Sequence, residues 1–195
     1  MTSQAKRVEN TRSQLIWLAA LAGVMLITRG SLLEGLVPVQ LHDASWAVFL
    51  LAGAILRKPR FLAALALLAL SLDLLALCGD GGSLGACMRP SYLVLMASWL
   101  LLFGAGYLMQ TSTKAASLAR NLALAGAAVT LAYGLTSGGF YLWSGLYSDW
   151  TFAEFWNMSA PHFLMALGTS LAYTLAGLLV WAMASRSRSD VTASA

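Results

Sequence analysis

The sequence has 195 residues, of which 59% are hydrophobic and only 10% are charged, and its mean hydropathy is +0.72. A soluble domain of this size cannot bury so much apolar surface, since such domains have about 45–50% apolar and about 25% charged residues. Intrinsic disorder is excluded as well, because it needs low hydrophobicity and high charge. The net charge of +4 does not indicate a nucleic-acid partner, since the basic residues do not cluster as on a DNA-reading face. The composition predicts an integral membrane protein.

Six apolar stretches follow one another along the chain, at residues 15–28, 45–56, 61–78, 92–109, 115–135 and 163–184. They are continuous, rich in Leu and Ala and without apolar–polar alternation, so they predict helices and not barrel strands. A helix needs about 20 residues to cross about 30 Å of hydrocarbon. The first stretch reaches this length if it continues toward Leu33, and the second only if it begins near Val39. We expect an all-α membrane domain of six transmembrane helices at residues 14–184, between tails at 1–13 and 185–195.

The basic residues predict the orientation of this bundle. If the chain crosses six times, all Lys and Arg residues except Arg29 and Arg89 lie on the side that holds both termini. Most of the acidic residues lie on the opposite side. The positive-inside rule then places both termini in the cytoplasm. The first stretch is followed by Arg29-Gly30 and not by a signal-peptide cleavage site, so we expect it to remain as a span.

Both cysteines, Cys78 and Cys87, lie in or beside a glycine-rich outer segment at residues 79–91. Three interpretations remain open: a structural disulfide in an oxidising compartment, two inert thiols, or a thiolate that binds a soft metal or takes part in redox chemistry. A zinc site is not expected, because the segment has neither Cys-x-x-Cys nor a nearby histidine pair. Cys87 is the better metal ligand, since Arg89 would favour its thiolate. Desolvation at the end of an apolar stretch favours the neutral thiol of Cys78.

Other polar residues of the outer side are candidate ligand contacts. Asp43 is placed to cap the second stretch, and His42 beside it is either an interfacial hydrogen-bond donor or a ligand contact. Asp73 lies inside the third stretch, where an ionisable side chain costs free energy and is a functional-site candidate by default. It would either bind substrate amides or pair with a neighbouring helix.

Eight of the twenty aromatic residues fall in the expected outer loop at residues 137–161, among them Tyr141 and Trp143. They predict either an interfacial aromatic belt or a lid that closes over a large ligand. Ser159 and Pro161 are expected to begin the sixth stretch, as its N-cap and as a proline in its first turn.

The predicted topology, together with the stretch His42-Asp-Ala-Ser-Trp-Ala-Val-Phe-Leu-Leu-Ala-Gly53 and a cysteine-bearing outer loop, resembles a known family. These features are similar to the S-components of energy-coupling-factor (ECF) transporters, and among them to the BtuM-type solitary cobalamin transporters of proteobacteria. The resemblance covers roughly residues 15–184. It implies an ECF S-component-like bundle in the bacterial inner membrane that binds cobalamin and takes it up.

The resemblance also implies that a cysteine thiolate coordinates the cobalt, a role that falls on Cys87 first and on Cys78 second. A strong thiolate donor would labilise a cyano group on the opposite face of the corrin, which gives slow decyanation as a hypothesis. The remaining substrate contacts would come from a set of outer residues, with the aromatic ones covering the corrin: Arg89, Tyr92, His42, Asp43, Asp73, Tyr141 and Trp143.

The expected partners are cobalamin, as transported ligand and not as a cofactor of the chain itself, and the lipid bilayer. An ECF energising module would dock on the first helix, where Ala19 and Gly23 form a small-x-x-x-small surface. The sequence contains no Walker A motif, so we do not expect the chain itself to hydrolyse ATP. The alternative from another class is a membrane thiol-disulfide oxidoreductase that uses Cys78 and Cys87 with a quinone.

Overall fold

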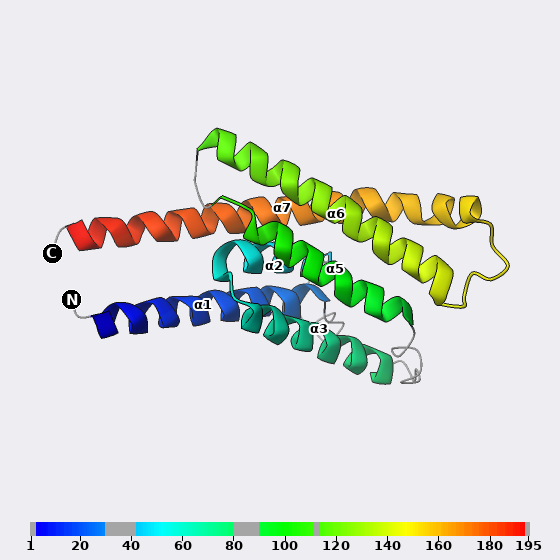
Figure 1. Cartoon of the computed structure of the whole chain (residues 1–195), viewed down its shortest axis with the longest axis horizontal. Coiled ribbons are helices and arrows are strands. Elements are labelled where there is room, and N and C mark those ends of the chain that lie inside the picture. Colours follow the sequence, from blue (N-terminus) through cyan, green and yellow to red (C-terminus); the bar gives the residue numbers. More distant parts are fainter. Residues whose placement is uncertain (1–2, 30–41, 80–89, 111–113, 194–195) are drawn as a thin grey trace.

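The computed structural model describes residues 3–29, 42–79, 90–110 and 114–193, with side chains at 11–29, 42–76, 90–110 and 114–184. Within these ranges the chain forms α1 (Ser3–Arg29), α2 (Ser45–Leu51) continued by the π-helical segment η2 (Ala52–Leu56), α3 (Pro59–Gly79), α5 (Pro90–Tyr107), α6 (Ala115–Trp143) and α7 (Phe152–Ala193). Successive helices run in opposite directions, so that both termini lie at one end of the bundle (Figure 1). We call this end the terminal end. The opposite end, where α1 ends and α2 begins, is the distal end.

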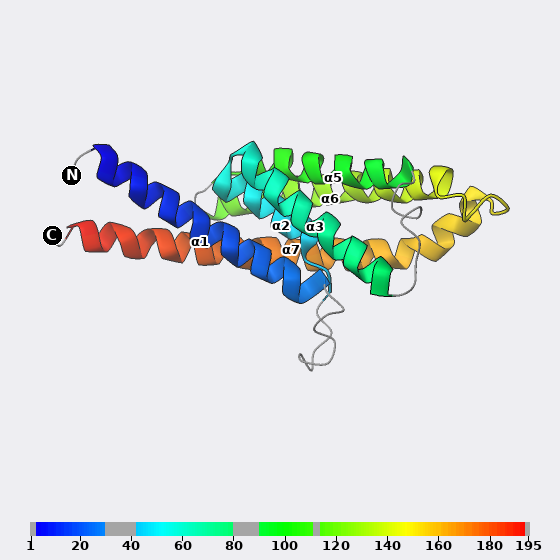
Figure 2. The same ribbon diagram turned by 90° about the horizontal axis from the view of Figure 1, so that it is seen from below.

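The central element of the bundle is the short helix formed by α2 and η2. All of its residues except Trp46 and Ile55 are buried. It packs against α1, α5 and α7, and the view from below shows it enclosed among the longer helices (Figure 2). A helix that is covered on all sides needs no polar face, which explains its continuous apolar sequence.

In the described part of the chain, five helical segments are long and apolar enough to cross a membrane, namely Thr11–Arg29, Pro59–Ala76, Pro90–Tyr107, Ala115–Trp143 and Phe152–Ala184. The central helix is shorter, with 7 residues in α2 and 5 in η2. At 1.5 Å per residue it spans about 18 Å, less than the hydrocarbon thickness of about 30 Å. The second predicted stretch therefore forms a helix that is too short to count as a span, and its expected earlier beginning near Val39 lies outside the described ranges.

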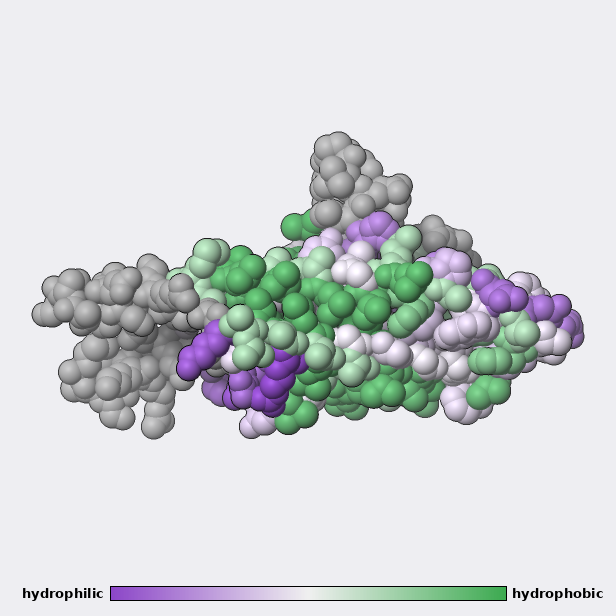
Figure 3. All heavy atoms as spheres, turned by 90° about the horizontal axis from the view of Figure 1, so that it is seen from above, coloured by the Kyte–Doolittle hydropathy of each residue, from purple (hydrophilic) through white to green (hydrophobic). Residues whose placement is uncertain are grey.

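The long helices turn most of their apolar side chains outward. In the most apolar window of each spanning segment, only 11–33% of the residues are buried. Figure 3 shows apolar side chains covering the middle of one face, with hydrophilic ones toward the ends of the described part. Soluble monomers rarely expose apolar surface of this extent. The fold is therefore that of an all-α, multi-pass membrane protein, as the composition predicts.

The connection between α6 and α7 differs from the sequence prediction. Residues 137–161 were expected to form a loop, but α6 continues to Trp143 and α7 begins at Phe152. The start of α7 is a capping box: the backbone N–H of Thr151 donates to Glu154 Oε2 (2.7 Å), and the backbone N–H of Glu154 donates to Thr151 Oγ1 (3.3 Å). The prediction that Ser159 caps this helix and that Pro161 lies in its first turn is wrong, since Pro161 lies inside α7.

Candidate functional site

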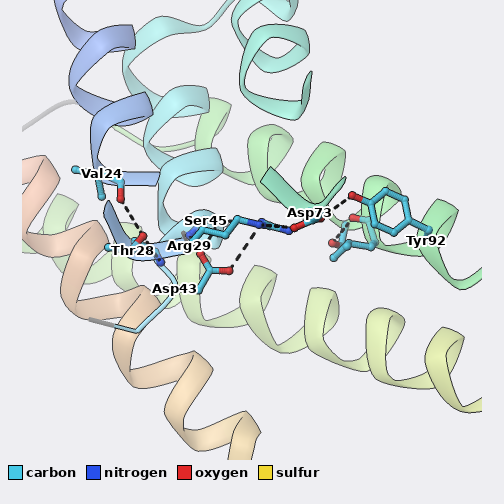
Figure 4. Close-up of polar contacts among 10 residues, drawn as sticks. Val24, Thr28, Arg29, Asp43, Ser45, Asp73 and Tyr92 are labelled. Carbon is cyan, nitrogen blue, oxygen red and sulfur yellow. Dashed lines mark hydrogen bonds and ion pairs between the residues drawn. The ribbon is translucent and has the colours of Figure 1, made fainter. Parts of the chain in front are cut away.

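An ion pair between α1 and α3 lies at the distal end. Arg29, the last residue of α1, donates from Nε to Asp73 Oδ1 (2.9 Å) and from Nη2 to Asp73 Oδ2 (2.8 Å), as Figure 4 shows. The two side chains are only 13% and 21% exposed. This bidentate geometry is the strongest form of arginine–carboxylate contact. Of the two predicted roles of Asp73, the structure shows the pairing with a neighbouring helix.

The ion pair extends to the central helix and to α5. Arg29 Nη1 donates to Ser45 Oγ (2.9 Å) and lies 3.8 Å from Asp43 Oδ2, while the Tyr92 hydroxyl donates to Asp73 Oδ2 (2.6 Å). We call these five residues the Arg29 cluster: Arg29, Asp43, Ser45, Asp73 and Tyr92. The cluster joins four helices at one point and brings one basic and two acidic side chains together.

Asp43 fixes the beginning of the central helix. Its Oδ1 accepts hydrogen bonds from the backbone N–H of Ser45 (2.8 Å) and from Ser45 Oγ (2.6 Å). The preceding backbone N–H, that of Ala44, donates to Thr28 Oγ1 (3.1 Å) on α1. These contacts satisfy donors that a helix start leaves without intrahelical partners. Asp43 thus makes a local Asx-type contact beside the helix start, but the N-cap position is taken by Ala44 and no side chain caps the helix there, so the predicted cap role of Asp43 is wrong by one residue.

A cavity of about 290 Å³ opens beside the cluster, between the start of α2, the distal half of α6 and α7. Both histidines of the chain line it, His42 from the segment before α2 and His162 from α7. Asp43 also lines it and so belongs to the cavity and to the Arg29 cluster. The cavity therefore adjoins the one point where charged groups of several helices meet at this end of the described structure.

Two aromatic side chains form a wall of the cavity. The rings of Trp46 and Tyr133 lie 6.2 Å apart at 69°, an edge-to-face arrangement. Tyr133 is held in place by its hydroxyl, which donates to the backbone oxygen of Ser159 (2.5 Å), and by the ring of Phe163 at 5.2 Å. The wall is thus a fixed apolar surface.

Polar atoms face the cavity from α6 and α7. Thr136, Thr169 and Ser170 belong to its lining, and Ser170 is almost fully buried. The hydroxyls of Thr136 and Thr169 donate to backbone oxygens one turn earlier in their own helices. His162 Nδ1 lies 3.3 Å from the backbone oxygen of Met158. Hydroxyl and imidazole groups of the lining residues can form hydrogen bonds with a ligand. Among the residues whose positions are described, no group of three His, Cys, Asp or Glu is arranged to hold a metal ion.

The sequence-predicted site residues separate into three groups. His42 and Asp43 line the cavity, and Asp43, Asp73 and Tyr92 share the Arg29 cluster. Tyr141 and Trp143 lie elsewhere: the Tyr141 hydroxyl donates to the backbone oxygen of Trp150 (2.9 Å), its ring packs on Phe155 at 5.1 Å, and Trp143 is exposed. Cys87 and Arg89 lie outside the described residues, and Cys78 lies in the last turn of α3, beyond the residues whose side chains are described.

Arg29 and His162 are among the residues of the site that the sequence did not single out. From the sequence, Arg29 was used only as one of the two basic residues on the side opposite the termini. An isolated arginine and an isolated acid such as Asp73 at membrane depth are nevertheless expected to pair. His162 was not named among the candidate ligand contacts. The sequence does contain an indication of its role, because the chain has only two histidines and both lie at expected outer ends of apolar stretches.

The chain matches no protein-family model, and no curated protein shows significant sequence similarity to it.

Proposed function

We propose that the protein binds a corrinoid at the distal end of its bundle and takes part in corrinoid uptake across the bacterial inner membrane. The observation that carries the proposal is the place of residues 42–53, the stretch on which the resemblance to cobalamin transporters rests. This stretch forms the start of the buried central helix, and its first residues line the distal cavity and enter the Arg29 cluster. Ligand sites commonly lie between the helices of a bundle. A site near one face of a membrane bundle is where an uptake protein receives its substrate.

The distribution of charge supports an orientation with the cavity facing outward. Arg57, Lys58 and Arg60 lie at the turn from η2 to α3, and Lys114 and Arg120 lie at the start of α6. These turns are at the terminal end (Figure 1). By the positive-inside rule, that end and both termini are cytoplasmic, so the distal cavity opens toward the periplasm, where an incoming corrinoid arrives.

The distal polar groups suit the periphery of a corrinoid. Its amide side chains donate to carboxylates such as that of Asp43 and accept from hydroxyls and imidazoles. We assign the cobalt to the thiolate of Cys87, which precedes α5 by three residues. The sulfur donates an electron pair to Co(III), and the displaced axial ligand leaves with its own pair, so no oxidation or reduction is involved. The same donation would weaken the bond to a cyano group on the opposite face, which would leave as cyanide with its own electron pair and give the slow decyanation hypothesised from the sequence.

The test is a binding titration of the purified full chain with hydroxocobalamin, followed by absorbance. We expect a stoichiometric complex with a changed corrin spectrum in the wild type and in Cys78→Ser, and loss of the spectral change in Cys87→Ser. Persistence of the change in Cys87→Ser would overturn the assignment of the sulfur. Absence of any corrinoid complex in the wild type would overturn the function.

The same preparations separate this proposal from the oxidoreductase alternative. Corrinoid uptake requires a free thiol at residue 87, so thiol titration without reductant should detect it. A Cys78–Cys87 disulfide that is reduced and re-formed with added quinone, in protein that binds no corrinoid, would support the oxidoreductase instead.

A further inference from the structure

The connection between α6 and α7 carries a surface of aromatic side chains that is separate from the distal cavity. This connection extends past the distal ends of α3 and α5 in both ribbon views (Figure 1 and Figure 2). We call residues 140–156 the aromatic tip. Apolar surface that projects from a protein in this way indicates a partner that covers it. From residue 142 onward, the large apolar side chains of the tip that are 42–64% exposed are Leu142, Trp143, Leu146, Trp150, Phe152 and Trp156.

A small core of its own holds the aromatic tip in shape. Phe155, which is only 3% exposed, packs on the rings of Tyr141 (5.1 Å) and Tyr147 (5.0 Å). The Tyr141 hydroxyl donates to the backbone oxygen of Trp150 (2.9 Å), and Gly145 turns the chain with φ of 69°. A lid has to open and close over its ligand, whereas these contacts tie the tip together across the turn. The exposed rings therefore form a fixed surface, which favours the interfacial belt over the lid.

The lengths of α6 and α7 match the distance between the two surfaces of a membrane. At 1.5 Å per residue, α6 rises about 35 Å from Arg120 near its terminal end to Trp143, and α7 rises about 38 Å from Trp156 to Trp181. The hydrocarbon core is about 30 Å thick, and the bilayer with its headgroups is about 40–45 Å thick. If Arg120 and Trp181 lie at one headgroup level, Trp143 and Trp156 therefore lie at the other.

The charge of the tip indicates which kind of lipid surface it fits. The sequence has no Lys or Arg between Arg120 and Arg186, and the charged residues of the tip are the exposed acids Asp149 and Glu154. Anionic headgroups attract basic side chains, so the tip gains no attraction from them. Indole and phenol rings are amphipathic and lie at headgroup level in membrane proteins, with an apolar body and a hydrated N–H or O–H. The tip therefore fits a neutral, zwitterionic interface.

We infer that the aromatic tip is a membrane anchor, which inserts its exposed rings and leucines into the zwitterionic headgroup region at the distal surface of the bilayer. The acids Asp149 and Glu154 lie on the aqueous side of this anchor. Interfacial aromatic residues of this kind set the depth and tilt of a bundle. The ring of Trp143, which the resemblance assigns to the corrin, contacts lipid instead.

The test measures the depth of nitroxide labels on the full chain in phosphatidylcholine vesicles. Leu146→Cys labels the tip, and Leu131→Cys labels an equally exposed position near the middle of the α6 span, both in a Cys78→Ser/Cys87→Ser background. Electron paramagnetic resonance reports collisions with oxygen and with a water-soluble nickel chelate, calibrated with lipids labelled at known depths. We expect the label at 146 at headgroup level and the label at 131 in the hydrocarbon. Nickel access at 146 equal to that of a free nitroxide in buffer, or as low as at 131, would overturn the inference.

Two further measurements separate the contribution of the rings from that of headgroup charge. Trp143→Ala/Trp156→Ala removes two exposed rings but keeps the core around Phe155, and it should shift the label at 146 toward water. Leu135→Ala removes an exposed side chain of α6 outside the tip and should leave the depth unchanged. An unchanged depth in the tryptophan variant would exclude the rings as the anchor. Added phosphatidylglycerol should not deepen the label, and insertion that requires it would exclude a zwitterionic partner.

Discussion

Gly53 and Gly106 occupy reciprocal positions where the central helix crosses α5, each against the backbone of the other helix. A Cβ on Gly53 would lie 2.0 Å from the carbonyl oxygen of Phe103, and a Cβ on Gly106 would lie 2.0 Å from that of Leu50. Small residues allow this kind of close approach in membrane bundles. The small-residue pair expected from the sequence, Ala19 and Gly23 on α1, takes no part in such a crossing: Ala19 is exposed, and a Cβ on Gly23 would meet nothing within 4 Å.

Replacement of either crossing glycine by alanine should separate the two helices. We expect Gly53→Ala and Gly106→Ala each to destabilise the protein by at least about 1–3 kcal/mol, the usual cost of overpacking, because the obstacle is backbone and cannot rotate away. Gly104→Ala is the matched control on α5, where a Cβ meets nothing within 4 Å. It should be neutral or stabilising by about 0.5–1 kcal/mol, since alanine favours helix. Thermal unfolding in one detergent measures all three, and equal destabilisation by Gly104→Ala would contradict the close crossing.

The ion pair of Arg29 and Asp73 predicts a specific pattern in a double-mutant cycle. Asp73→Leu leaves the largely buried guanidinium without its bidentate partner, and Arg29→Met leaves the carboxylate with the Tyr92 hydroxyl alone. Removal of one partner of a buried pair costs about 3–5 kcal/mol, whereas replacement of both partners by apolar groups is often neutral. We expect the double variant to unfold at a higher temperature than either single variant.

The control for this cycle is Glu154→Gln, which changes an exposed carboxylate in a local capping box far along the chain from the cluster. Its effect should stay below about 1 kcal/mol. Additive losses in the double variant would show that the two charges do not depend on each other.

The sequence was sufficient for the helical class and for the order of the helices, because each is a long apolar run between polar turns. It could not show that residues 45–56 form a buried centre, since a helix covered by protein and one covered by lipid are equally apolar. The contact of Asp43 with the start of the central helix was predictable because it is local, although the N-cap itself is Ala44. The α6–α7 connection was misread because Ser159 and Pro161 imitate a helix start, although Thr151-Phe-Ala-Glu154 already carried the capping-box pattern.

The site itself was predictable only in part. Asp43, Asp73 and Tyr92 were named as polar candidates, but which residues they meet depends on how four helices pack, and a single sequence does not contain that information. The cavity follows from the same packing. Tyr133 was missed because an aromatic residue inside an apolar run has the same sequence appearance whether it faces lipid, core or cavity.

Arg57 closes the terminal end of the central helix in a left-handed conformation, with φ of 54°. Its Nε donates to the backbone oxygen of Ala54 (3.2 Å), its Nη2 donates to that of Met109 (2.8 Å), and its guanidinium lies over the ring of Tyr107. Arg57→Ala loses these contacts and keeps the steric cost of the positive φ. Arg57→Gly loses the same contacts, but glycine adopts a positive φ without that cost. Thermal unfolding should rank the wild type above Arg57→Gly, and Arg57→Gly above Arg57→Ala by about 1 kcal/mol. Reversal of the last two would show that residue 57 is not left-handed.

Asn121 fixes the connection between α5 and α6 by pairing its side-chain amide with the backbone of Gln110. The Gln110 N–H donates to Asn121 Oδ1 (2.9 Å), Asn121 Nδ2 donates to the Gln110 oxygen (2.7 Å), and the asparagine is only 1% exposed. Asn121→Asp keeps the shape but turns a carboxylate toward that oxygen, so the buried donor is lost and two acceptors face each other. We expect a loss of about 1–3 kcal/mol in unfolding free energy. Ser117→Ala, which removes an exposed contact to the Gln110 side chain, should stay within about 0.5 kcal/mol. Because this connection lies at the terminal end, Asn121→Asp should leave the corrinoid Kd of the folded protein unchanged, and a change in that Kd would mean that the two ends of the bundle are coupled.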